Sequence, residues 1–292
     1  MFTRLLKLYL QLHKITFMEF IEAFQVQPGI IENIEFDILI VASGYEERST
    51  FLVEKYNLNA KHKIAIAYKE KDKELFRKQN DRVLNDLGFQ MISTSSQNPK
   101  KLFLKLNQII NDSFKDEVKI LVDYSSMTKI IYAGILEFLM NEEKNLSAAT
   151  VYFSYTPAKF CRPQKVKNLK ETGSVITFGQ KKKNDKPTAL VIGLGIEKAK
   201  AKLLVNKLKP DNLILMYADP SFDKSYVDIA FENNQDVIRL VEPRNFVNYP
   251  LFDLNKTSEL LTNLCLDLRM KFNVILAPLG PKRSEEHTSE LQ

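Results

Sequence analysis

Two short polar stretches, residues 43–50 and 123–129, carry the side chains that could do chemistry. Their hydroxyl groups can donate hydrogen bonds to an anionic ligand, and Arg48 and Lys129 can neutralise a phosphate group. Gly44 permits a tight turn or a close approach of the backbone to a ligand. The predicted ligand-binding residues are Ser43, Gly44, Arg48, Ser49, Asp123, Ser125, Ser126, Thr128 and Lys129.

The same residues could instead have structural roles. Serine and threonine side chains cap helices, and acidic residues such as Glu46 and Glu47 stabilise a first helical turn. Arg48 could form an ion pair with one of these two glutamates. For any single residue the structural role is the more common one, whereas convergence of both stretches at one place would favour a binding site.

Catalysis is a further hypothesis. Glu46 or Glu47 could form a carboxylate pair with Asp123, as in a nucleotide hydrolase or glycosidase, and Arg48 or Lys129 could stabilise developing charge. A nucleophilic triad is not expected, because neither stretch contains a histidine. These residues favour catalysis no more than binding, and an interaction scaffold is a third hypothesis.

Both stretches follow strongly apolar runs. Runs at residues 36–42, 64–68, 89–93, 118–122 and 150–155 predict five strands, and helical patterns separate them. Strands that alternate with helices predict an α/β fold, a Rossmann-like doubly wound parallel sheet. Ligands of such sheets lie outside the carboxyl ends of the strands, so the two polar stretches should meet there. Before this sheet, residues 1–35 predict a helical extension.

An internal repeat follows the first unit. Residues 189–197 resemble residues 38–46 and place Gly195 over Gly44. Other segments also match the first unit, at a nearly constant distance along the sequence. They are the predicted strands 213–217 and 237–241, the helix 255–270, and the strand and loop 273–282. We therefore predict tandem Rossmann-like units at 36–156 and 188–282, joined by a linker or arm at 157–187, with the second unit truncated after its fourth strand. Candidate ligand-binding residues of the second unit are Gly193, Gly195 and Lys282.

Residues 193–198, Gly-Leu-Gly-Ile-Glu-Lys, begin like a dinucleotide-binding fingerprint. Lys198 occupies the position of the third glycine, which normally allows a helix to pack closely on a strand. NAD binding is therefore not expected, and no cofactor is predicted. Residues 217–220, which follow a predicted strand, are interpreted as a turn rather than as a ribose contact.

The spacing Asp123-x-Ser125-x-x-x-Lys129 resembles the signature that follows the fourth strand of CARF domains, the CRISPR-associated Rossmann-fold sensors. Ser43-Gly44 lies where that family also contacts its ligand. The resemblance covers residues 36–156 and implies binding of a cyclic oligonucleotide or related nucleotide, commonly across a homodimer, and a role in antiviral defence. Of this signature, the second unit keeps only the lysine, Lys282. The sequence contains no signature of the ribonuclease domain that accompanies some members of the family.

The composition sets broader limits. A formal net charge of +6 over 292 residues favours an anionic partner such as a nucleotide or other phosphorylated ligand, and leaves nucleic acid open. Two cysteines and three histidines predict neither a disulfide framework nor a metal site. No apolar run reaches membrane-spanning length, which favours a cytoplasmic protein without a membrane partner. Residues 283–292 resemble the in-frame translation of a common sequencing adapter, and Met18 is an alternative start.

Overall fold

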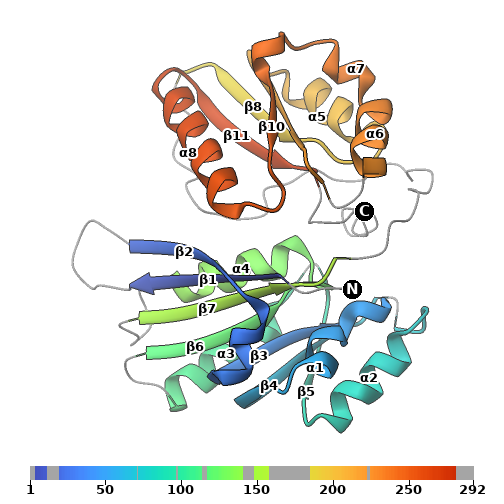
Figure 1. The fold of residues 1–292 in the computed structure, drawn as a ribbon, viewed down its shortest axis with the longest axis vertical. Helices are drawn as coiled ribbons and strands as arrows, with labels where there is room; N and C mark the ends of the chain where they lie inside the picture. Colours follow the sequence, from blue (N-terminus) through green and yellow to red (C-terminus); the bar gives the residue numbers. More distant parts are fainter. Residues whose placement is uncertain are drawn as a thin grey trace. The chain divides into compact units, whose positions relative to one another are not determined.

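In the computed structural model, the chain forms two compact units, and each is described by itself (Figure 1). The described residues up to Pro157 form unit 1, and those from Asp185 form unit 2. The structure describes residues 4–11, 20–70, 72–96, 98–113, 117–140, 148–157, 185–221 and 224–280. Most of the predicted linker at 157–187, namely residues 158–184, lies outside the described residues, as do Lys282 and the adapter-like tail.

Unit 1 contains a seven-stranded sheet in the order β2-β1-β7-β6-β3-β4-β5. The five strands from β3 to β7 are mutually parallel, as the alternation of strands and helices predicts. The chain order reverses between β3 and β6, so the unit has the strand order of a Rossmann-like sheet. The strands are β1 Arg4–Gln11, β2 Phe20–Val26, β3 Glu35–Ser43, β4 Asn59–Tyr68, β5 Gln90–Thr94, β6 Glu117–Asp123 and β7 Ala148–Tyr155.

Helices cover both faces of this sheet. On one face, α3 (Lys100–Ser113) and α4 (Lys129–Met140) bury apolar side chains spaced at helical intervals against β3, β6 and β7. On the other face, α1 (Phe51–Lys55) and α2 (Arg77–Asp86) contribute Leu52 and Leu84 to a second core. Two 3-10 turns, η1 (Pro28–Asn33) and η2 (Glu47–Ser49), complete the unit. The sheet is therefore doubly wound.

The prediction of a helical extension at residues 1–35 is wrong for Arg4–Gln11 and Phe20–Val26, which form strands, and within the described residues of this segment only Pro28–Asn33 is helical, as the 3-10 turn η1. Arg4–Gln11 forms β1, which pairs antiparallel with β7, and Phe20–Val26 forms β2, which pairs antiparallel with β1. Leu6, Leu8 and Leu10 also recur every second residue, so this sequence fits a strand as well as a helix. The unpaired edge of β7 decides between them, because it offers a ladder of hydrogen bonds.

Unit 2 repeats the first part of this arrangement. Its four strands are all parallel and have the order β10-β9-β8-β11, which corresponds to β5-β4-β3-β6 of unit 1. The strands are β8 Thr188–Gly193, β9 Asn212–Ala218, β10 Phe246–Tyr249 and β11 Asn273–Pro278. The helices are α5 Lys200–Leu208, α6 Lys224–Asn233, α7 Gln235–Ile238 and α8 Leu254–Lys271, with a 3-10 turn η3 at Pro243–Asn245. The shared strand order supports the internal repeat.

One strand of the predicted repeat is misplaced. The sequence predicts a third strand at residues 237–241, but α7 includes Val237 and Ile238, and β10 takes the third strand's place in the sheet. Val237 is buried in the core next to α5, and a short apolar run of this kind fits a helix as well as a strand. Among the described helices, none has the length and apolarity that a membrane crossing requires.

Candidate functional site

The two predicted polar stretches meet at the carboxyl edge of the unit 1 sheet. They follow β3 and β6, which are neighbouring parallel strands on either side of the point where the strand order reverses. The hydroxyl groups of Ser49 and Ser126 are 2.7 Å apart and share a hydrogen bond. The two loops therefore converge, as a binding site at this edge requires. That their residues bind a ligand stays a prediction.

Gly44 is required where the two loops touch. A Cβ atom built on Gly44 would lie 2.8 Å from Ser126 Cβ and 2.9 Å from Ser49 Oγ. Such distances are shorter than van der Waals contact, so a larger residue would push the loops apart. Gly44, predicted to allow a tight turn or a close approach of the backbone, allows the two loops to approach closely, and its contact with a ligand stays a prediction.

Asp123 stabilises the turn that the chain makes directly after β6. It is buried, and its Oδ1 accepts hydrogen bonds from the backbone N–H of Ser125, at 3.1 Å, and from the Ser125 hydroxyl. The Ser125 Oγ in turn accepts a hydrogen bond of 2.8 Å from the backbone N–H of Thr156, just after β7. These bonds link the ends of two neighbouring strands.

Arg48 lies inside the unit rather than on its surface, with a side chain that is 1% exposed. Its Nε donates to Glu46 at 2.6 Å, and one terminal nitrogen donates to the Thr156 carbonyl at 2.7 Å and to the Tyr155 hydroxyl at 3.3 Å. The guanidinium group also lies 5.5 Å from the centre of the Tyr155 ring. Arg48 thus ties the loop after β3 to the end of β7.

Asn80 on α2 is a supporting residue that sequence reasoning missed. It is buried, and its Nδ2 group donates to the carbonyls of Gly44, at 2.9 Å, and Glu46, at 2.8 Å. Both amide hydrogens therefore hold the backbone of the loop after β3. An asparagine inside a charged helix carries no sequence signal of this role.

A second polar group lies beside Asn80. Ser43 Oγ donates to Asp81 at 2.6 Å, and Arg77 donates to Asp81 at 2.9 Å and to the Tyr68 carbonyl at 2.8 Å. These bonds join α2 to the ends of β3 and β4. Ser43, predicted as a ligand contact, is fully buried in this network.

The rim of this edge is more open and carries charges of both signs. Lys129, the first residue of α4, is half-buried, and Glu47 is exposed. Thr128 is buried; its backbone N–H donates to the Tyr68 hydroxyl and its Oγ1 to the Ser96 carbonyl. On the loop after β4, burial raises the pKa of Glu70, but hydrogen bonds from Ser95 and Ser96 outweigh this effect and lower the pKa.

Unit 2 repeats the support of the first loop. Asn234, which follows α6, is buried and donates from Nδ2 to the Gly195 carbonyl at 2.7 Å, as Asn80 does to Gly44. Glu197 forms a buried ion pair with Lys200, as Glu46 does with Arg48. Gly193 lies beside Gly280 at the ends of β8 and β11. The third residue predicted for this site, Lys282, lies outside the described residues.

The sequence shows no similarity that identifies a function. No protein-family model, no curated protein and no solved structure matches the chain. Within the described residues, no group of three or more His, Cys, Asp or Glu side chains could hold a metal ion. Functional inference therefore depends on the geometry of the two units.

Proposed function

We propose that unit 1 is a nucleotide-binding sensor whose ligand lies at the carboxyl edge of its sheet, beside the start of α4. The observation that carries this proposal is the direct Ser49–Ser126 hydrogen bond between the loops after β3 and β6. It fixes two loops at the point where open α/β sheets bind their ligands. Lys129, half-buried at the start of a twelve-residue helix, adds a positive charge where the helix dipole also favours an anion.

The contacts that Glu46 and Asp123 already make within the unit favour binding over hydrolysis. Glu46 is paired with buried Arg48, and Asp123 accepts two hydrogen bonds from Ser125. A general base must aim a lone pair at the proton that it takes. Glu46 Oε2 and Asp123 Oδ1 are instead engaged in bonds within the loops, and Glu47, the other carboxylate of the hydrolase hypothesis, is exposed at the rim. The buried residues then act as the frame of the site, and Lys129 makes the contact with the ligand.

The ligand class to test first is a cyclic oligonucleotide. The spacing Asp123-x-Ser125-x-x-x-Lys129, which resembles that of CARF sensors, supports this choice. The experiment measures the melting temperature of the full chain with a panel of cyclic and linear nucleotides. A ligand at 100 times its dissociation constant stabilises by about 2.7 kcal/mol, which raises the melting temperature by roughly 5–10 °C for a unit of this size.

Lys129→Ala should remove this shift, because it deletes the charge that pairs with the phosphate. Lys101→Ala, which changes an exposed lysine on α3, is the matched control and should keep the shift. Recovery of intact ligand after incubation supports a sensor, and recovery of cleaved ligand would assign a hydrolase instead. A folded protein that shifts with no nucleotide would refute the proposal and leave the scaffold hypothesis.

A further inference from the structure

The unit 2 sheet ends at β11, on the side of β8 (Figure 1). β11 pairs with β8 along one side, and no strand of the described residues pairs with its other side. Ile275 and Leu276, in the middle of β11, are 36% and 49% exposed. Successive side chains of a strand point to opposite faces of the sheet, so apolar surface is exposed on both faces of this edge.

The internal repeat identifies the counterparts of these residues in unit 1. Val191 of β8 corresponds to Ile40 of β3 in the repeat. Leu276 is the β11 partner of Val191. Val122 is the β6 partner of Ile40. Leu276 therefore corresponds to Val122, and the residue before each corresponds likewise.

Both counterparts are fully buried in unit 1. Leu121, the counterpart of Ile275, lies in one core with Tyr152 of β7, which is also its partner across the two strands. Val122 lies in another core with Ile131 of α4. In unit 1 a neighbouring strand and a helix thus cover apolar positions that β11 leaves exposed.

The sequence of β11 suits pairing with a second copy of itself. Its six residues, Asn-Val-Ile-Leu-Ala-Pro, carry no charge, whereas edge strands that stay exposed are commonly protected by lysine or another charge. In an antiparallel pair centred between Ile275 and Leu276, each of these two residues faces the other on the second copy. Lys271 then faces the partner's Gly280, so no like charges, which would be destabilising, lie directly opposite each other.

Unit 1 shows that this fold accepts an antiparallel strand on the same side of its sheet. Beyond β6 and β7, the strand β1 pairs antiparallel with β7 along eight residues. A parallel sheet of this kind can therefore be extended in the antiparallel direction at this side.

We propose that two copies of this chain associate through β11, which pairs antiparallel with itself about a two-fold axis and joins the two unit 2 sheets. Such an interface uses the same surface on both copies, as two-fold dimers do. The backbone groups on the open side of β11 gain hydrogen-bond partners, and Ile275 and Leu276 become shielded from water. This association does not depend on ligand binding by unit 1.

The test is size-exclusion chromatography with light scattering on the full chain, over a series of protein concentrations. The mass should rise from that of one chain to that of two. Leu276→Lys should raise the dissociation constant on the order of a hundredfold, because it brings two positive charges together at the axis. Leu203→Lys makes the same change at a leucine of α5 that is 44% exposed, and it should keep the dimer.

Amide hydrogen exchange of the unchanged chain is the second measurement, for the case that Leu276→Lys does not fold. Residues 273–278 should exchange more slowly at concentrations where the dimer forms than at concentrations where it dissociates. A single-chain mass at every concentration would overturn the proposal, and protection of these residues in that monomer would assign the edge to another segment of the same chain. A dimer that persists in folded Leu276→Lys protein would also overturn it. Lys129→Ala should leave the association unchanged, which separates failure here from failure of the site in unit 1.

Discussion

Replacement of Asn80 by alanine tests whether the loop after β3 depends on support from α2. The Asn80 amide is buried and donates to two carbonyls, those of Gly44 and Glu46, at 2.9 and 2.8 Å. Each lost hydrogen bond costs about 1 kcal/mol, and more where the carbonyl stays without water. We therefore expect Asn80→Ala to lower the free energy of unfolding of unit 1 by roughly 2–4 kcal/mol.

The assay is scanning calorimetry, combined with amide hydrogen exchange over the loop of residues 43–50. For a unit of this size, the expected loss lowers the melting temperature by roughly 5–15 °C. Asn85→Ala is the matched control, because Asn85 is exposed on the same helix and gains the same helix propensity on replacement by alanine. The difference between the variants isolates the hydrogen bonds.

Unit 2 provides an internal test of the same reasoning. Asn234 Nδ2 donates to the carbonyls of Gly195, at 2.7 Å, and Ala230, at 2.8 Å. Asn234→Ala should therefore destabilise unit 2 by a similar amount and leave the protection of residues 43–50 unchanged. If Asn80→Ala and Asn85→Ala melted within 1 °C of each other, the assigned role of Asn80 would be refuted.

Two further predictions concern a close contact and a half-buried tyrosine. Gly44→Ala should lower the free energy of unfolding, measured by urea titration, by about 1–3 kcal/mol, because the added Cβ would lie 2.8 Å from Ser126 Cβ. Gly29→Ala is the control: no atom lies within 4 Å of the added group, so its free energy of unfolding should hardly change. Burial raises the pKa of Tyr249 to about 12, so the folded state keeps its proton after the unfolded state has lost it near pH 10. The free energy of unfolding should fall between pH 10 and 12 by up to about 1.4 kcal/mol per unit, and an equal fall in Tyr249→Phe would contradict this assignment.

The sequence by itself determined the order of most strands and helices, because the spacing of apolar residues along the chain indicates which segments form each. The runs at 36–42, 64–68 and 118–122 became β3, β4 and β6, and the repeat of this pattern became a second parallel sheet. Parallel strands connected by helices place their carboxyl ends at one edge. The meeting of the loops at 43–50 and 123–129 therefore followed from the fold class.

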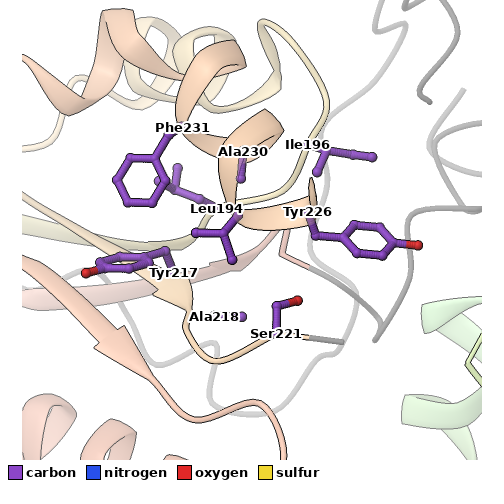
Figure 2. Close-up of a pocket in the computed structure, with 9 residues that line it drawn as sticks. Leu194, Ile196, Tyr217, Ala218, Ser221, Tyr226, Ala230 and Phe231 are labelled. Carbon is purple, nitrogen blue, oxygen red and sulfur yellow. The ribbon is translucent and has the colours of Figure 1, made fainter. Parts of the chain in front are cut away.

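The tertiary structure decided which polar residues lie inside and which apolar runs pair as strands. Arg48 could have faced a phosphate, but Glu46 and Thr156 hold it inside the unit, and these partners come from distant parts of the chain. Arg4–Gln11 became a strand because β7 had a free edge, which local periodicity does not encode. In unit 2, the small hollow lined by Tyr217 of β9 and Phe231 of α6 likewise depends on how a strand end and a helix pack (Figure 2). Burial, pairing and cavities arise from contacts between distant residues, so they emerge only when the chain is folded.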